Sequence, residues 1–135
     1  MCMIDYANDG DWQCLSAPRM VKARKDHHCG ECHRTISKGE TYEHGRFVDD
    51  YGFPVVRTCA HCVAVRSWLV VQCGGWLYEG VLEDLAEHWQ ENWECRGRYL
   101  ALAIAGMERQ WRGKDGSLMR VMGVYKKPAL VGAGR

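Results

Sequence analysis

The paired motifs Cys29-Gly-Glu-Cys32 and Cys59-Ala-His-Cys62 decide the fold of this 135-residue chain. Within each motif the two cysteines have the spacing that one tight turn brings together. Between the motifs, residues 33–58 hold two strand-like runs joined by the turn-forming residues 49–52, which predicts a β-hairpin. Directly after the second motif the chain becomes almost continuously apolar, which predicts a buried helix.

Four thiolates delivered by two tight turns are the ligand set of a closed, structural zinc site. We therefore predict one structural Zn²⁺ ion with four ligands, which are Cys29, Cys32, Cys59 and Cys62. Two other chemistries use the same motif. The run 29–33 matches a c-type haem attachment motif, but attachment requires export. A thioredoxin-like redox pair would leave the other motif without a role.

Composition and charge limit the class of protein. Hydrophobic residues make up 47% of the chain and the formal net charge is +1, which indicates a real core and argues against bulk electrostatic coating of nucleic acid. The N-terminal run MCMIDYANDGDW carries acids where a signal peptide carries basic and apolar residues, and no run reaches the roughly 18 apolar residues of a membrane span. We therefore expect a cytoplasmic protein with reduced cysteines.

The charge is unevenly distributed, because residues 63–95 are mainly acidic and residues 96–135 mainly basic. One interpretation is that these helices pair with each other or are simply solvated. The other is that the basic tail contacts phosphate.

Periodicity predicts the remaining elements of an α+β fold. Strands are expected weakly over 20–28 and more strongly over 40–48 and 53–58, and the buried helix over 63–72, stopped by Gly74 and Gly75. Two amphipathic helices follow over 80–94 and 98–112. Because a short Gly-containing turn joins them, we expect an antiparallel helix pair. A short strand is expected over 117–125.

These elements group into four expected segments. They are a flexible N-terminal arm (1–18), a zinc-binding module of hairpin plus helix (19–75), a helical module packed on it (76–125) and a flexible tail (126–135).

The order of motif, hairpin, and motif at a helix start resembles the treble-clef class of zinc fingers. The pieces that carry this resemblance are CGEC, GETYEHGRF, FPVVRT and CAHCVAVRSWL. The wider sequence, to about residue 112, resembles small uncharacterised bacteriophage and prophage proteins in the pieces MCMIDY, KARKDHHCGECHRTISKGETYE, RTCAHCVAVRSWL and CGGWLYEGVLEDLAEHW. The resemblance implies a treble-clef-like zinc module in a phage-type protein of a bacterial host cytoplasm. It implies no active site.

We expect a non-enzymatic binding protein, because a closed zinc site has no open coordination position and the sequence holds no nucleophile–base constellation or phosphate loop. The leading hypothesis is a protein partner, a host enzyme or defence component, bound through aromatic anchors. The tryptophans that could serve are Trp76, Trp89, Trp93 and Trp111. At helical spacing the same residues also fit a core, and the oligomeric state stays open.

The first alternative is a zinc-finger protein that binds DNA or RNA, with a steep dependence on salt. The basic residues near the first motif are Arg19, Lys22, Arg24, Lys25 and Arg34, and those behind are Arg109, Arg112, Lys114, Arg120, Lys126 and Lys127. The second alternative is an HNH-like metal-dependent nuclease, degenerate or active. It would use His44 on the first hairpin strand with Asp49 or Asp50, but no Asp-His pair precedes a Pro there and no Asn lies between His44 and Cys59.

The remaining cysteines are Cys2, Cys14, Cys73 and Cys95. Core packing is the ordinary role of such residues, and a second metal site built from Cys73, Cys95 and His88 is the alternative. Four histidines crowd the motifs, namely His27, His28, His33 and His61. Each offers an alternative ligand or a group that orients one, although exposed or capping polarity is the ordinary role.

Overall fold

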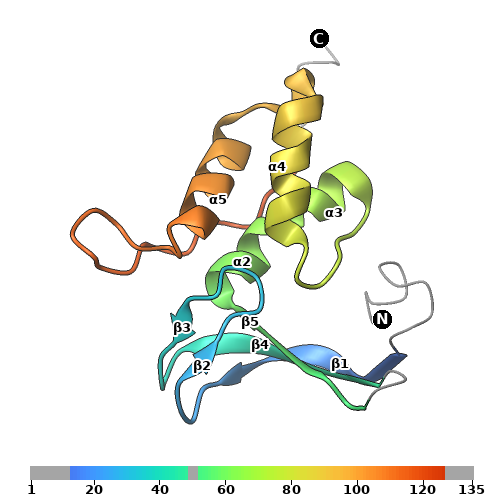
Figure 1. Ribbon diagram of the computed structural model, residues 1–135, viewed down its shortest axis with the longest axis vertical. Coiled ribbons are helices and arrows are strands. Elements are labelled where there is room, and N and C mark those ends of the chain that lie inside the picture. The colour runs from blue at the N-terminus through green and yellow to red at the C-terminus, as the bar shows by residue number, and fades with distance from the viewer. Residues whose placement is uncertain (1–12, 49–51, 127–135) are drawn as a thin grey trace.

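The computed structural model describes residues 13–48 and 52–126 and has the α+β composition expected from the sequence. Its strands are β1 (Gln13–Lys22), β2 (His27–His28), β3 (Thr35–Ile36), β4 (Thr41–Val48) and β5 (Val55–Cys59). Its helices are α2 (Ala60–Val65), α3 (Ser67–Cys73), α4 (Val81–Glu91) and α5 (Arg98–Glu108), with a short 3-10 helix, η1 (Trp93–Cys95). Figure 1 shows the sheet at one end and α3, α4 and α5 at the other, with α2 leading from one to the other.

β4 is the central strand of a three-stranded antiparallel sheet, with β1 on one side and β5 on the other. The predicted hairpin is therefore confirmed as β4 and β5, although its turn at 49–51 lies outside the described residues. Side chains alternate between the two faces of β4. Glu43 and Phe47 are buried on the face toward the helices, whereas His44 and Arg46 lie on the opposite face.

The strand predicted over 20–28 is wrong in its extent. β1 starts at Gln13 and ends at Lys22, so residues 13–18, which were assigned to a flexible arm, belong to a strand, while residues 1–12 lie outside the described part. β1 pairs with β4 despite register shifts around Ser16, which explains why its alternation is hard to read in the sequence. β2 pairs with β3 in a separate two-stranded ribbon around the first cysteine motif.

The apolar run after the second motif forms two helices, not one. α2 begins immediately after Cys59 and ends at Val65, and α3 begins at Ser67. Arg66 lies at the break, where its buried side chain pairs with Glu43 of β4 and stacks 3.9 Å above the Trp76 ring. α3 ends as predicted, at Gly74 in the left-handed conformation, with φ of 86°.

α4 and α5 lie side by side and are joined at one end, as predicted for an antiparallel pair (Figure 1). Both are shorter than expected. α4 ends at Glu91, so Trp93 falls in η1 and leaves the apolar stripe, with 75% of its surface exposed. α5 ends at Glu108, and the chain folds back to place Trp111 over Gly106.

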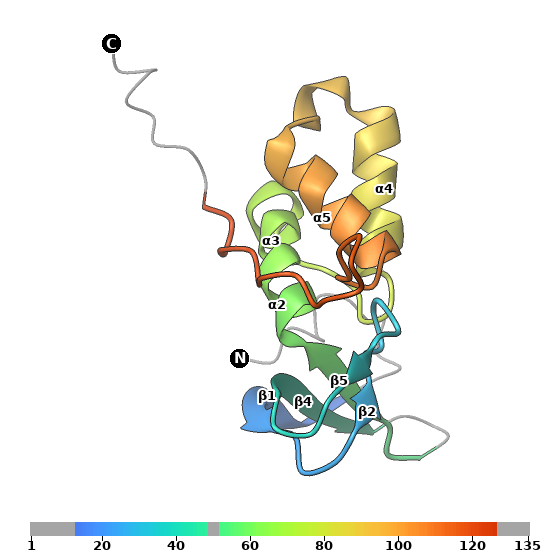
Figure 2. The ribbon, with the colours of Figure 1, turned by 90° about the vertical axis from the view of Figure 1, so that its left-hand side faces the viewer.

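The strand expected over 117–125 is absent from the described residues, where this segment contributes only an isolated bridge between Arg112 and Leu118. The segment is extended and runs along α2 and α3 (Figure 2). The Tyr125 backbone N–H donates to Ser67 Oγ at 2.7 Å, and the Tyr99 hydroxyl donates to the Gly123 carbonyl at 2.6 Å. Packing against helices therefore replaces the pairing that a strand would need.

One buried cluster joins the two halves of the molecule. It contains the four motif cysteines, Trp68 and Leu69 of α3, and the apolar stripes of α4 and α5. The boundary at residue 75 between a zinc module and a helical module therefore stays a prediction, because the core runs across it. No described helix has the length and hydropathy needed to span a membrane.

Candidate metal centre and basic groove

The four predicted ligands meet at one point. The sulfur atoms of Cys29, Cys32, Cys59 and Cys62 all lie within 4.8 Å of one another, and all four residues are buried. Cys32 and Cys59, far apart in the chain, have their sulfurs 3.8 Å apart. The ribbon of β2 and β3 positions the first pair, while the end of β5 and the first turn of α2 position the second.

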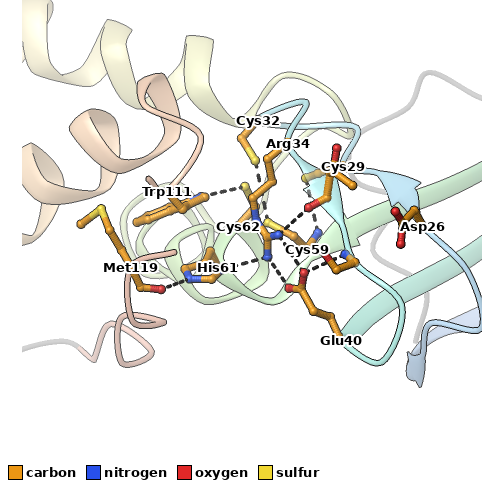
Figure 3. A network of polar contacts seen from close by, with 12 residues as sticks. Asp26, Cys29, Cys32, Arg34, Glu40, Cys59, His61, Cys62, Trp111 and Met119 are labelled. Atoms are coloured by element: carbon orange, nitrogen blue, oxygen red, sulfur yellow. Dashed lines mark hydrogen bonds and ion pairs between the residues drawn. The ribbon is translucent and has the colours of Figure 1, made fainter. Parts of the chain in front are cut away.

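Hydrogen bonds from N–H groups point at the sulfur atoms, as they do around thiolates (Figure 3). The backbone N–H groups of Glu31 and Cys59 each donate to Cys29 Sγ at 3.3 Å. The indole Nε1–H of Trp111 donates to Cys62 Sγ at 3.5 Å. Hydrogen bonds from the other three thiols lower the pKa of Cys59, which favours a thiolate in the cluster.

This donor set fits a zinc ion. Four soft sulfur ligands on short turns match the tetrahedral preference of Zn²⁺, and their complete burial leaves no exposed position for a substrate. Four thiolates would be costly to bury without a counter-charge, and a bound cation would supply it. The site is therefore suited to structure rather than to chemistry on a substrate.

A chain of hydrogen bonds beside the sulfur cluster connects the segment just after the first cysteine motif to His61 of the second motif. Arg34 donates to the Glu40 carboxylate at 2.8 and 3.2 Å, and its Nη2 lies 3.2 Å from His61 Nδ1. His61 Nε2 lies 2.6 Å from the Met119 carbonyl oxygen, so Nε2 carries the proton and Nδ1 accepts from Arg34. Figure 3 shows this chain of contacts beside the cysteines.

Arg34 was predicted to contact nucleic acid, and its position does not suit that role. Its side chain is only 2% exposed and its guanidinium is held by Glu40. His61 was expected to be exposed or capping, yet it is buried and stacks on Trp111 with ring centroids 5.1 Å apart. The burial of His61 is not visible in the sequence, because Trp111 and Met119 lie far away along the chain. Arg34 has one near partner, Glu40, and one distant partner, His61.

The other four predicted nucleic-acid residues share one open cavity of about 830 Å³ on the outer face of the sheet. We call it the basic groove and define it by eight of its lining side chains, which are Arg19, Lys22, Arg24, Lys25, His27, Tyr42, His44 and Arg57. No carboxylate is among the described residues that line it. Asp26, in the same turn, accepts a hydrogen bond from the Lys38 N–H instead.

Strand register aligns three of these side chains in a row. Arg19 on β1 is opposite His44 on β4, and His44 is opposite Arg57 on β5. The pKa of His44 is lowered, first by burial and then by the positive charges of Arg57, Arg19 and further basic neighbours. These neighbouring charges make this face of the sheet positive. Arg57 Nε is buried without a hydrogen-bond partner among the described residues. This row cannot be read from the sequence, because it depends on the register of the strands.

His44, the described residue of the nuclease alternative, belongs to no cluster of ligating side chains among the described residues. In the described part of the chain, the four cysteines are the only group of three or more ligating side chains brought that close. His44 lies instead between two arginines, while Asp49 and Asp50 fall outside the described residues.

The remaining cysteines form no second cluster of that kind within 13–48 and 52–126. Cys73 Sγ lies 2.8 Å from His88 Nε2, and Asp84 lies 4.0 Å from the same nitrogen. Cys95 is partly buried against the same core. Cys2 and the Cys14 side chain lie outside what the structure describes.

Comparisons with protein-family models, with curated proteins and with solved structures gave no match. The resemblance to treble-clef zinc fingers and to phage proteins therefore stays an expectation from the sequence.

Proposed function

We propose that this protein is a non-enzymatic nucleic-acid-binding module, held together by one structural zinc ion, that binds phosphates in the basic groove. The observation that carries the proposal is the cross-strand row of Arg19, His44 and Arg57. Arg19 and Arg57 flank His44, and three more cations, Lys22, Arg24 and Lys25, line the same groove. With no carboxylate among the described groove residues to offset them, a bound polyanion is the natural counter-charge.

The structure supports nucleic-acid binding in the basic groove better than a protein interface built on tryptophans. Trp111 is fully buried and Trp76 is 3% exposed, so both belong to the core. Trp89 is partly buried against the same core. Trp93 is 75% exposed, with the Arg96 guanidinium 4.7 Å from its ring. A protein partner docked on Trp93 is the second candidate function.

The test is a titration of the zinc-loaded full chain with labelled single-stranded DNA, RNA and duplex DNA at several salt concentrations, read by fluorescence anisotropy. We expect affinity to fall as salt rises, with a log–log slope of about −0.7 to −0.9 for each phosphate contact. Arg57→Ala should weaken binding and reduce the slope by about one such unit. Arg98→Ala removes an exposed charge outside the groove and serves as the matched control.

Absence of binding, or an equal effect of Arg57→Ala and Arg98→Ala, would contradict a role of the groove. In that case Trp93→Ala should be compared with the wild type in crosslinking to host proteins, because the second candidate then remains.

A further inference from the structure

The basic groove differs from a simple phosphate track because rings lie among its cations. His27 and His44 are both half-buried at its surface. Tyr42 contacts both of them, with ring centroids 5.3 Å from His27 and 6.4 Å from His44. Only 5% of Tyr42 is exposed, so it supports the two imidazoles from below.

The protonation state of His44 suits stacking on a base better than pairing with a phosphate. Burial and the neighbouring charges of Arg57, Arg19, Arg46 and His27 hold the pKa of His44 below its usual value. The imidazole is therefore neutral at neutral pH and offers a flat face and hydrogen-bonding nitrogens. The arginines on either side supply the positive charge instead.

A flat ring flanked by cations matches one kind of nucleic acid. Proteins that bind single strands combine a positive groove with rings on which unpaired bases stack. A duplex keeps its bases inside and offers this surface only phosphates. The open cavity of about 830 Å³ is large enough to accept unpaired nucleotides.

We propose that the basic groove binds single-stranded nucleic acid in preference to duplex, with a base stacked on His44 and the neighbouring phosphates on Arg19 and Arg57. This inference rests on the proposed function, since it names the form of nucleic acid that the groove takes. Single-stranded DNA and single-stranded RNA both offer unpaired bases and phosphates, so the test includes both.

The test compares a short single strand, as DNA and as RNA, with a hairpin duplex of equal phosphate number, using the zinc-loaded full chain. We expect the single strand to bind about tenfold more tightly, which is the effect of one stacked base. His44→Ala should remove about that factor for the single strand and leave duplex affinity nearly unchanged. His44→Phe, which keeps a ring, should retain the preference, whereas Arg57→Ala should weaken both ligands.

The possible outcomes separate the preference for single strands from nucleic-acid binding itself. Equal or tighter duplex binding that still depends on Arg57 overturns the single-strand inference alone. A loss in His44→Ala that is the same for both ligands also overturns it. Absence of binding to either ligand overturns the proposed function and the inference with it. Zinc content and thermal melting check the fold of each variant, and His44→Gln replaces His44→Ala if the latter does not fold.

Discussion

Glu31 ties the first cysteine motif to the helical half of the protein. Its buried carboxylate accepts hydrogen bonds from the backbone N–H groups of Glu79, at 2.8 Å, and Val81, at 3.2 Å. Val81 is the first residue of α4, where N–H groups have no partner within the helix and an anion is favoured, and Glu79 lies two residues before it. A residue between the two cysteines of the first motif thus caps a helix that begins far along the chain.

Removing this cap should weaken the molecule without removing its metal. We expect Glu31→Ala to cost about 1–3 kcal/mol in the free energy of unfolding, because buried N–H groups lose their acceptor. Glu31→Gln keeps one acceptor oxygen and should cost less. Urea denaturation with zinc analysis measures both effects. Glu83→Ala, an exposed acid in the first turn of α4, is the control. An equal loss in Glu31→Ala and Glu83→Ala would refute the capping role.

Gly106 has a steric role of the same local kind. A Cβ atom at this position would lie 2.1 Å from the Trp111 ring, and the Trp111 N–H donates to the Gly106 carbonyl at 2.7 Å. That ring in turn reaches Cys62 and His61. The glycine therefore lets the end of α5 close over the metal centre.

We expect Gly106→Ala to destabilise the protein by about 1–3 kcal/mol, as overpacking of a core does, although alanine is the better helix former. Thermal melting followed by near-ultraviolet circular dichroism, which reports the buried indole, measures the change. Gly123→Ala is the matched control, since a Cβ there meets no atom within 4 Å. Unchanged melting of Gly106→Ala would show that Trp111 does not need this contact.

At the scale of elements, the break between α2 and α3 joins the helices to the sheet. Arg66 pairs with Glu43 of β4, and both side chains are about nine-tenths buried. A buried ion pair adds little net stability when intact, but removing one partner leaves an uncompensated charge. The break therefore fixes where the helices sit on the sheet.

We expect Arg66→Met to cost about 3–5 kcal/mol, because Glu43 is left buried without its partner. The double variant Glu43→Gln/Arg66→Met should recover a large part of that loss. Guanidinium denaturation of the single and double variants gives the coupling between the two sites. Additive losses would show that the two side chains act independently.

Sequence patterns predicted the elements that depend on local chemistry. Cysteine spacing gave the four clustered residues, alternation gave β4 and β5, and Gly74 marked the end of α3. Features set by distant partners were missed. Arg66 interrupts an apolar run that reads as one helix, and Arg34 looks like an exposed cation until His61 of α2 is placed beside it. Most of β1 was missed because its register shifts hide its alternation.

At the scale of the whole molecule, the cysteine cluster sits where all parts meet. It belongs to the same core as Trp68 of α3, Leu85 of α4 and Leu100 of α5. The basic groove lies on the other face of the sheet, so it can be changed without touching the metal ligands. Binding and folding should therefore separate experimentally: groove variants lose ligand and keep zinc, whereas cysteine variants lose both.

Zinc content and thermal unfolding of the wild type, Cys59→Ser and Cys95→Ser show whether a metal ion holds this fold together. We expect one zinc ion per chain in the wild type and in Cys95→Ser, whose residue lies outside the cluster. Cys59→Ser should lose the ion and its cooperative unfolding transition, and a chelator should do the same to the wild type, because metal binding and folding are coupled. A metal-free wild type, or a Cys59→Ser variant with an unchanged melting curve, would contradict the central claim that zinc holds this fold together.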